Sequence, residues 1–180
     1  MKTTVLKFFT LSAAIFAFST ISFGQGNTDS ETVTAGARII TPINLTLSGA
    51  LDFGDVVKPN SAPFTVTVNS TSRTSTGGAT FIGETYDAPD FSVTGNNNEV
   101  YYIVLGGLTL GALPLTGTNT SNTLDIKDFT INGSAYTDNF EMTLDGSGED
   151  TFTIGATLDG KASTASDTYQ GTFTVTVNYN

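Results

Sequence analysis

The most regular alternation of apolar and polar residues in the chain lies in the segment 168–180. Phe173, Val175, Val177 and Tyr179 fall on one face of an extended chain, and threonine and asparagine side chains fall on the other. The pattern predicts one β-strand with a well specified register, because a slip of one residue would turn the whole apolar row toward water. We expect this strand to lie beside the first strand of its domain or beside a strand supplied by a partner.

Similar alternation recurs along most of the chain, separated by clusters of glycine, asparagine and serine that are typical of turns. Pro42 interrupts the first of these segments, which indicates an edge position or a switch between sheets. Beyond the first 24 residues, the chain shows no convincing helical periodicity. The pattern therefore predicts an all-β protein, an antiparallel immunoglobulin-like β-sandwich. The alternating segments are 32–40, 43–47, 51–57, 63–69, 79–85, 90–94, 99–105, 106–115, 124–131, 140–144, 152–158 and 168–180.

Three local features refine this expectation. A Gly-Asn-Asn-Asn cluster tolerates positive φ and lies between two alternating runs, so the segment 91–105 is expected to form a β-hairpin. Alternation breaks around Lys127 and Asp128, which indicates a β-bulge. Asn132 and Gly133 are typical of a tight turn.

The first residues have the pattern of an export signal. Two lysines precede an apolar run at 8–18, which is well short of the roughly 20 residues that a membrane-spanning helix needs. Small residues follow, and cleavage is expected after Gly24. The predicted organisation is therefore a signal peptide at 1–24, a flexible leader at 25–31 and a single β-sandwich domain at 32–180.

Composition narrows the classes of function. The chain has 7 basic and 17 acidic residues, and loss of the two lysines in 1–24 leaves a net charge of 5 − 17 = −12. This argues against binding to nucleic acid or to anionic membranes. The chain contains no histidine and no cysteine, which excludes histidine-based triads, cysteine nucleophiles and thiolate metal sites. Acidic pairs lie at expected turns, where solvated carboxylates are ordinary, so we expect no catalytic residue, no enzyme and no cofactor.

One acidic loop could supply oxygen ligands to calcium. Asp145, Glu149 and Asp150 flank a Gly-Ser-Gly sequence, and hard oxygen ligands suit Ca²⁺. The spacing does not match a helix-loop-helix calcium loop. A polar hairpin turn, whose charges discourage aggregation at a sheet edge, explains the same residues.

Several landmarks together resemble a known family. They are ARIITPINL at 37–45, LDFG at 51–54, FSVTG at 91–95, FTIGATL at 152–158 and YQGTFTVTVNY at 169–179. With these landmarks the chain resembles the family called domain of unknown function 4402, found in secreted bacterial proteins, over nearly all of its mature length. More distantly, the LDFG element and the final strand resemble spore coat protein U and the archaic chaperone-usher pilin domains.

The distant resemblance implies an incomplete immunoglobulin-like sandwich whose missing strand is lent by the N-terminal extension of the next subunit. This chain lacks the cysteines of those relatives, and between residue 25 and Ala35 the leader offers only Val33 as a large apolar residue. A donor strand would have to be 32–40, and the alternative is that 32–40 completes its own domain. The candidate donor residues are Val33, Ala35, Ala37 and Ile39, and the candidate acceptor edge is Phe173, Val175 and Val177.

The expected function is a structural or adhesive protein, secreted or at the cell surface after a periplasmic stage, with a pilin-like subunit as its polymeric form. Its expected partners are further copies or fimbrial proteins, which would pair through edge strands, and a periplasmic chaperone. There are two alternatives. One is a self-contained secreted domain that binds calcium or glycan. The other is a small outer-membrane β-barrel, although several strands look short for the ~9 to 11 residues that a membrane-spanning strand needs.

Overall fold

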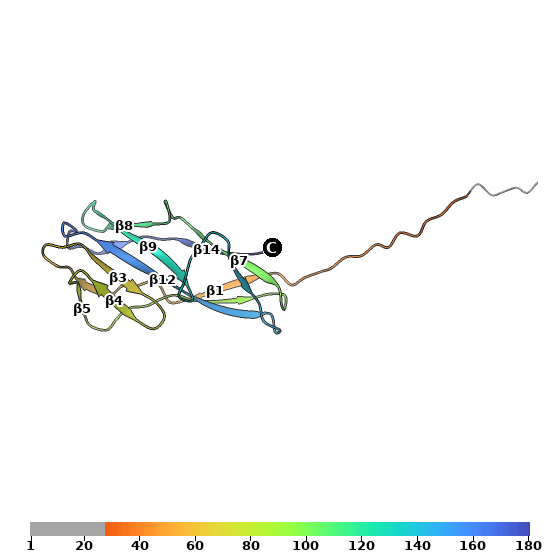
Figure 1. Cartoon of the computed structure of the whole chain (residues 1–180), viewed down its shortest axis with the longest axis horizontal. Helices are drawn as coiled ribbons and strands as arrows, with labels where there is room; N and C mark the ends of the chain where they lie inside the picture. Colours follow the sequence, from red (N-terminus) through yellow and green to blue (C-terminus); the bar gives the residue numbers. More distant parts are fainter. Residues whose placement is uncertain (1–27) are drawn as a thin grey trace, which may run out of the picture. The chain divides into compact units, whose positions relative to one another are not determined.

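The computed structural model describes residues 28–180, and within them the regular secondary structure consists of antiparallel β-strands alone (Figure 1). No helix occurs in this range, which confirms the all-β prediction. The signal peptide expected at 1–24, and the first part of the leader, lie outside the described residues. The strands are β1 (Asn44–Ser48), β2 (Asp55–Val57), β3 (Phe64–Val68), β4 (Arg73–Thr76), β5 (Thr80–Ile82), β6 (Asp90–Thr94), β7 (Val100–Gly106), β8 (Leu113–Gly117), β9 (Thr123–Ile131), β10 (Ser134–Ala135), β11 (Phe140–Thr143), β12 (Glu149–Gly160), β13 (Tyr169–Gln170) and β14 (Thr174–Tyr179).

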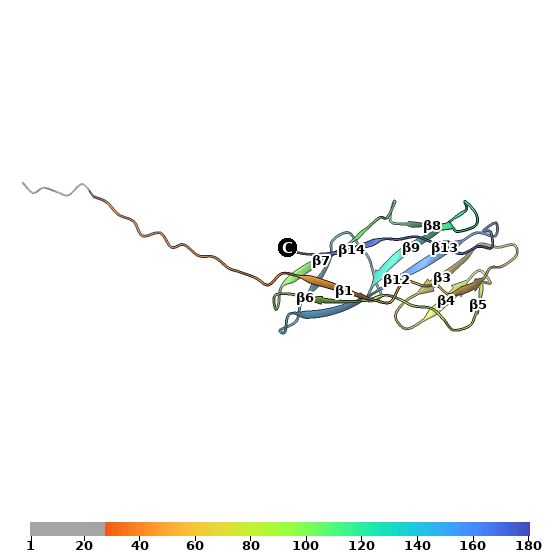
Figure 2. The same ribbon diagram turned by 180° about the vertical axis from the view of Figure 1, so that it is seen from behind.

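The strands form three sheets. The nine-stranded sheet has the order β1-β6-β12-β9-β8-β13, with β10 added on β9 and β3 joining β4 to β12. The three-stranded sheet has the order β11-β7-β14, and β2 pairs with β5 in a separate ribbon. β12, with 12 residues, links two parts of the nine-stranded sheet (Figure 2). Its first part pairs with β6, and its later part pairs with β3 and β9.

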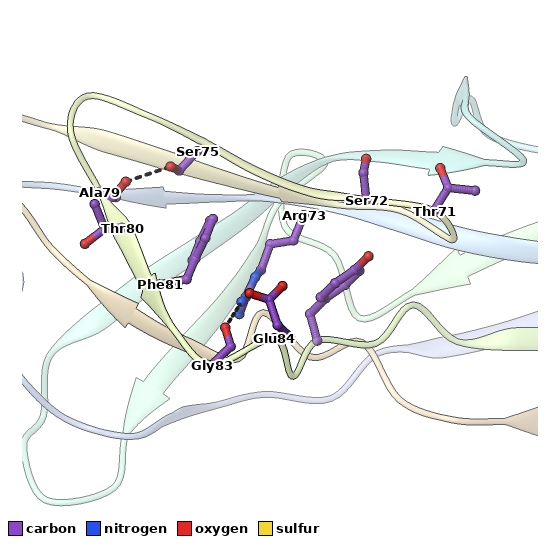
Figure 3. A pocket seen from close by; sticks show the side chains of 10 residues that line it. Thr71, Ser72, Arg73, Ser75, Ala79, Thr80, Phe81, Gly83 and Glu84 are labelled. Atoms are coloured by element: carbon purple, nitrogen blue, oxygen red, sulfur yellow. Dashed lines mark hydrogen bonds between the residues drawn. The ribbon is translucent and has the colours of Figure 1, made fainter.

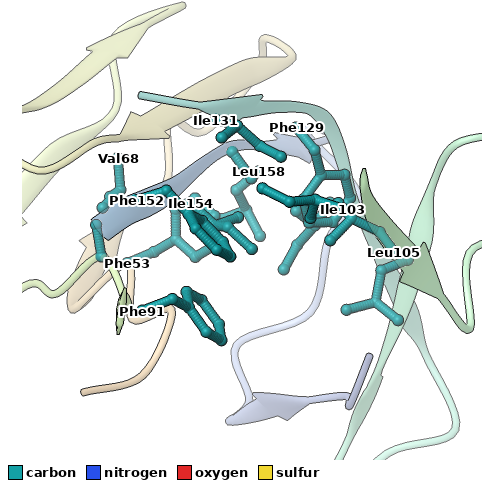
Figure 4. Close-up of a cluster of buried hydrophobic side chains, with 14 of the residues drawn as sticks. Phe53, Val68, Phe91, Ile103, Leu105, Phe129, Ile131, Phe152, Ile154 and Leu158 are labelled. Carbon is teal, nitrogen blue, oxygen red and sulfur yellow. The ribbon is translucent and has the colours of Figure 1, made fainter. Parts of the chain in front are cut away.

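The core lies where the inward rows of these strands meet (Figure 4). In β12, Phe152, Ile154 and Leu158 alternate with threonine and aspartate, so the strand gives one apolar face to the interior. The ring of Phe152 stacks on that of Phe91 in β6, with the centroids 4.8 Å apart and the planes 10° from parallel. Such contacts join neighbouring strands through their side chains as well as their backbones.

The hairpin expected over 91–105 does not form. β6 pairs with β1 and β12, whereas β7 pairs with β11 and β14, so the turn between β6 and β7 carries the chain from one sheet to another. The turn itself fits the prediction, because Asn98 has a φ of +57°. Alternation and turn chemistry identify two strands and a reversal, but they do not determine which partner each strand selects.

The single strand expected over 168–180 is also divided. β13 pairs with β8 in the nine-stranded sheet, and β14 pairs with β7 in the three-stranded sheet. The break lies at Gly171, where an added Cβ would lie 2.8 Å from Leu115 Cδ2 and 3.1 Å from the Pro114 carbonyl oxygen. The close approach of β8 therefore requires glycine at the point where the chain changes sheets.

Other local predictions are confirmed. The pairing of β9 with β12 shifts register near Lys127, and Asp128 has a φ of +51°, as expected for a bulge. Asn132 and Gly133 both have positive φ in the turn before β10.

By contrast, the strand predicted over 32–40 is not present, since the structure assigns no strand to residues 28–43. A strand is defined by its ladder partner, and none of the described strands pairs with this segment.

Candidate functional site

Strands β14 and β1 are among those that end their sheets with one side unpaired. β14 is the last strand of the three-stranded sheet and pairs only with β7, and β1 is the first strand of the nine-stranded sheet and pairs only with β6. Within residues 28–180, no strand pairs with the second side of either. Each therefore presents a row of backbone N–H and C=O groups that a further strand could pair with.

The inward apolar row of β14 is less buried than that of its neighbour. Val177 lies opposite Ile103 in β7, on the same face of the sheet. Ile103 is fully buried, whereas Val177 is only partly buried. The same difference separates Val175 from Leu105, so burial falls off at the outermost strand.

β1 shows the same loss of burial at the other open edge. Leu47 lies opposite Phe91, and Leu45 lies opposite Val93. The two residues in β6 are buried, but Leu47 is 59% exposed although it points to the core side of the sheet. At both open edges the described part of the chain thus covers the inward apolar side chains only in part, and one further strand with an apolar face could cover the rest.

Tyr179 connects these two edges at one end. Its hydroxyl accepts a hydrogen bond from the Asn96 N–H at 2.6 Å and donates one to the Thr41 carbonyl oxygen at 2.9 Å. The end of β14 is thereby tied to the chain just before β1 and just after β6. Gly95 provides the space, because an added Cβ would collide with the Tyr179 hydroxyl.

Phe173 differs from the two valines that were predicted to share its role. It lies before β14 and its ring contacts that of Phe129 in β9, with the centroids 5.5 Å apart and the planes at 60°. This contact holds the start of β14 against the core. Phe173 is therefore already packed against Phe129, and Val175 and Val177 are the more open part of the candidate acceptor edge.

The candidate donor residues are exposed. Val33 is 86% exposed and Ile39 is 96% exposed, and Ala35 and Ala37 are exposed as well. These four alternate with residues of other types at a period of two, the same period as the inward rows of β1 and β14. In an extended strand they would form a single apolar face.

The acidic loop is used to build a turn. The Asp145 carboxylate accepts hydrogen bonds from the N–H groups of Ser147 and Glu149, at 2.8 and 2.9 Å. The bond from Glu149, and then that from Ser147, hold the pKa of the Asp145 carboxyl below its usual range. The carboxylate thus stabilises the reversal between β11 and β12.

Asp150, the third calcium candidate, binds a tyrosine. The buried Tyr101 donates its hydroxyl to Asp150 at 2.9 Å, and burial, together with this bond, raises the pKa of Tyr101 above its ordinary range. No group of three acidic side chains that could hold a metal is found among residues 28–180. The structure does not bring Asp145, Glu149 and Asp150 together as a ligand set.

A second feature, Arg73, was not identified from the sequence. Its guanidinium donates to the Gly83 carbonyl oxygen at 2.7 Å (Figure 3). It also donates to the carbonyl oxygens of Thr85 and Phe53, at 2.9 and 3.1 Å. It also lies 4.0 Å from the ring centroid of Phe81 and lines a polar pocket of about 580 Å³.

These contacts explain the LDFG landmark. Phe53 is buried in the core, and Asp52 accepts a hydrogen bond from the Gly54 N–H at 2.8 Å. A Cβ at Gly54 would collide with the Arg73 guanidinium and with the Thr85 carbonyl oxygen. The landmark therefore packs the chain around Arg73, and its role is structural.

The family model for the domain of unknown function DUF4402 matches residues 43–179, and the chain belongs to this family. The match begins just before β1 and ends with β14, so it includes both open edges. No curated protein matches the chain. Between residues 28 and 180, the structure contains no helix that is long and apolar enough to cross a membrane.

Proposed function

We propose that the protein is a secreted or cell-surface structural protein, a pilin-like subunit whose immunoglobulin-like sandwich is completed by a strand donated from another subunit. The observation that carries the proposal is the loss of burial at β1 and β14, where inward residues such as Leu47 and Val177 are more exposed than their cross-strand neighbours. A donated strand would bury these side chains and pair with backbone groups on both sides.

The chain has a suitable donor in 32–40. Full burial of a large aliphatic side chain such as Val33 or Ile39 contributes about 1.5–3 kcal/mol, and Ala35 and Ala37 fit where the core is already filled. Two ladders of hydrogen bonds would add to this and make dissociation slow. Such kinetic stability is what a surface fibre or adhesive layer requires.

The spacing of the landmarks supports the proposal, since it resembles that of subunits assembled in this way. Export by a signal peptide would deliver the chain to the periplasm, where a chaperone could occupy the open edge until a second subunit replaces it. The proposed location is the cell surface or the medium, and the proposed partners are other copies of the chain or related fimbrial proteins.

The test is a denaturing gel of material sheared from the cell surface, run unheated and heated and probed for this chain. We expect a ladder at multiples of the mature mass that collapses on heating. A single band at the monomer mass in both lanes would contradict the proposal.

Substitutions in the donor segment sharpen this test. Val33→Asp with Ile39→Asp places two charges on the apolar face of the donor and should abolish the ladder while the rest of the chain stays folded. The matched control is Thr32→Asp with Thr34→Asp, which adds the same charge to the opposite face and should keep the ladder. An equal effect of both variants would show that charge, and not the apolar face, determines assembly.

A further inference from the structure

We propose that the pocket between β4 and β5 binds a neutral glycan through the side chains of Arg73, Glu84 and Tyr86. The pocket has a volume of about 580 Å³, within the range of ~300–1,000 Å³ that is typical of small-molecule sites. The proposal goes beyond the proposed function, because it requires no second subunit. Such a site attaches the protein to a carbohydrate surface.

The pocket exists because two consecutive strands do not pair with each other. β4 pairs with β3, and β5 pairs with β2, so the chain from Arg73 to Ile82 encloses a gap. The Ser75 hydroxyl bridges this gap by donating to the Ala79 carbonyl oxygen at 2.7 Å (Figure 3). Arg73 bridges it again by donating to the Gly83 carbonyl oxygen. The walls are thereby held in place before a ligand binds, which lowers the entropic cost of binding.

Arg73 retains an N–H group for a ligand. Three backbone carbonyl oxygens occupy its Nη1 and Nη2, and residues 28–180 contain no acceptor for its Nε–H. In the same range no buried side-chain nitrogen or oxygen lacks a partner, so this Nε is open to solvent. Two aromatic rings fix its position, because the central carbon of the guanidinium lies 4.0 Å from the ring centroid of Phe81 and 5.3 Å from that of Tyr86.

Glu84 and Tyr86 add two further polar groups to the same pocket. Glu84 is exposed, and within the described part of the chain its carboxylate has no hydrogen-bond or ion-pair partner. The Tyr86 hydroxyl also has no partner in residues 28–180 and is therefore open to solvent. The pocket thus has one fixed donor, one charged acceptor and one hydroxyl that can do either.

This set of groups favours a neutral polyhydroxyl ligand. Each sugar hydroxyl both donates and accepts, so neighbouring hydroxyls can bind the Glu84 carboxylate and the Arg73 Nε–H at once. An anion is repelled by Glu84 and by the net charge of residues 39–180, which is 4 − 15 = −11, and a cation is repelled by Arg73. The partly buried rings of Phe81 and Tyr86 provide apolar contact for the C–H groups of a sugar ring.

The pocket lies away from the open edges of β1 and β14. Figures 1 and 2 show β4 and β5 at the end of the folded part that is opposite the C-terminus and the start of β1. A subunit bound at β1 and β14 therefore leaves the pocket accessible, and glycan binding is compatible with assembly.

The experiment applies the labelled mature chain to an array of neutral hexose oligosaccharides and their uronate and sulfated counterparts. We expect binding to neutral glycans. Glu84→Ala should weaken it about 10- to 100-fold and Tyr86→Phe about 2- to 10-fold, the values of a charged and a neutral hydrogen bond. Asp138→Ala, which removes an exposed carboxylate outside the pocket, should bind like the wild type. Binding to no neutral glycan, binding to acidic glycans alone, or equal binding by Glu84→Ala and the wild type would overturn the inference.

Arg73 provides a second readout that a purely structural role would not change. The mature chain has two arginines, so its ¹H-¹⁵N spectrum contains two Nε–H signals, and Arg38→Lys identifies the signal of Arg73. The spectrum is recorded on the Val33→Asp, Ile39→Asp chain, in which assembly is blocked. Titration with a soluble oligosaccharide that binds on the array should shift the Arg73 signal to saturation and leave the Arg38 signal in place. An Arg73 signal that does not move would place the glycan elsewhere and overturn the inference, whereas the gel ladder tests the proposed function separately.

Discussion

The Tyr179 hydroxyl donates a hydrogen bond to the Thr41 carbonyl oxygen, and this 2.9 Å contact ties the end of the last strand to the chain just ahead of the first. The same hydroxyl accepts the Asn96 N–H at 2.6 Å. One side chain thus joins the two sheets at one end of β14, while the inward residues further along the strand are left only partly covered.

Replacing Tyr179 with phenylalanine tests the energetic value of this connection. Tyr179→Phe removes both hydrogen bonds and keeps the ring, and each lost bond costs about 1 kcal/mol. We expect a fall in unfolding free energy of about 1–3 kcal/mol in urea titrations, since Asn96 and Thr41 lose a partner. The control is Tyr102→Phe, whose exposed hydroxyl makes one long contact of 3.4 Å with Glu141. Equal effects of the two substitutions would show that the connection contributes nothing specific.

Gly95 tests the same contact from the opposite side. A Cβ at this position would collide with the Tyr179 hydroxyl and lie 2.9 Å from Leu144 Cδ1. Gly95→Ala should therefore lower the unfolding free energy by about 1–3 kcal/mol, the usual range for overpacking. Gly146→Ala is the control, since nothing lies within 4 Å of a Cβ there. If the Tyr179 contact is responsible, the double variant Gly95→Ala, Tyr179→Phe loses less than the sum of the two single changes.

Sequence alternation predicted the inward rows but not the pairing of the strands. The pattern in β12 and β14 identifies which side chains face the core, because the period of two follows from strand geometry alone. It could not show that 168–180 changes sheets at Gly171, since the requirement for glycine there comes from Leu115 in another strand.

The residues that sequence reasoning missed act over long separations in the chain. Tyr179 and Thr41 are 138 residues apart, and Arg73 and Phe53 are 20 residues apart. Tyr179 appears in the sequence as an ordinary tyrosine in a strand pattern, and Arg73 lies in a polar stretch, 70–78, that was expected to be a loop, although its residues 73–76 form β4. Their roles depend on which strands pair, and that information is absent from local periodicity.

Calcium should have no effect on stability. Asp145 already accepts two backbone N–H groups and Asp150 already accepts the Tyr101 hydroxyl, so neither is available as part of a ligand set without giving up these bonds. We expect the same melting temperature in millimolar calcium and in EDTA. An EDTA-sensitive rise in melting temperature that disappears in Asp145→Asn would establish the calcium site instead.

Asp167 should determine part of the acid stability. Its carboxylate accepts hydrogen bonds from the Thr120 hydroxyl at 2.7 Å, the Asn119 side-chain amide at 2.8 Å and the Thr168 N–H at 2.8 Å. The bond from Thr120 above all, and then those from Asn119 and Thr168, hold the pKa of Asp167 well below its usual range.

The sign of the pH effect follows from this depressed pKa. The stabilisation is complete above the unfolded-state pKa of about 3.9 and is lost as pH falls through the lower folded-state value. Asp167→Asn should therefore be less stable than the wild type at neutral pH, and the difference should shrink below about pH 4. Asp138→Asn, which changes an exposed aspartate elsewhere, should show no such convergence in unfolding measurements between pH 2 and 7.

Arg73 should contribute far more to stability than a surface lysine that also has a good ion pair. Arg73→Ala leaves three carbonyl oxygens without their donor and removes the cation from the face of Phe81, which together should cost roughly 1–3 kcal/mol. Arg73→Lys should recover little of this, because an ammonium cannot reproduce the planar fork of donors.

The control is Lys127→Ala. Lys127 lies 2.7 Å from Asp159, but both side chains are 41% exposed, and solvent screening leaves exposed pairs of this kind with little effect on stability. Urea titrations of the three variants should therefore place Arg73→Ala and Arg73→Lys well below Lys127→Ala in stability. If Arg73→Lys matches the wild type, the positive charge alone would suffice, and the hydrogen bonds to Gly83, Thr85 and Phe53 would not be what holds the LDFG segment in place.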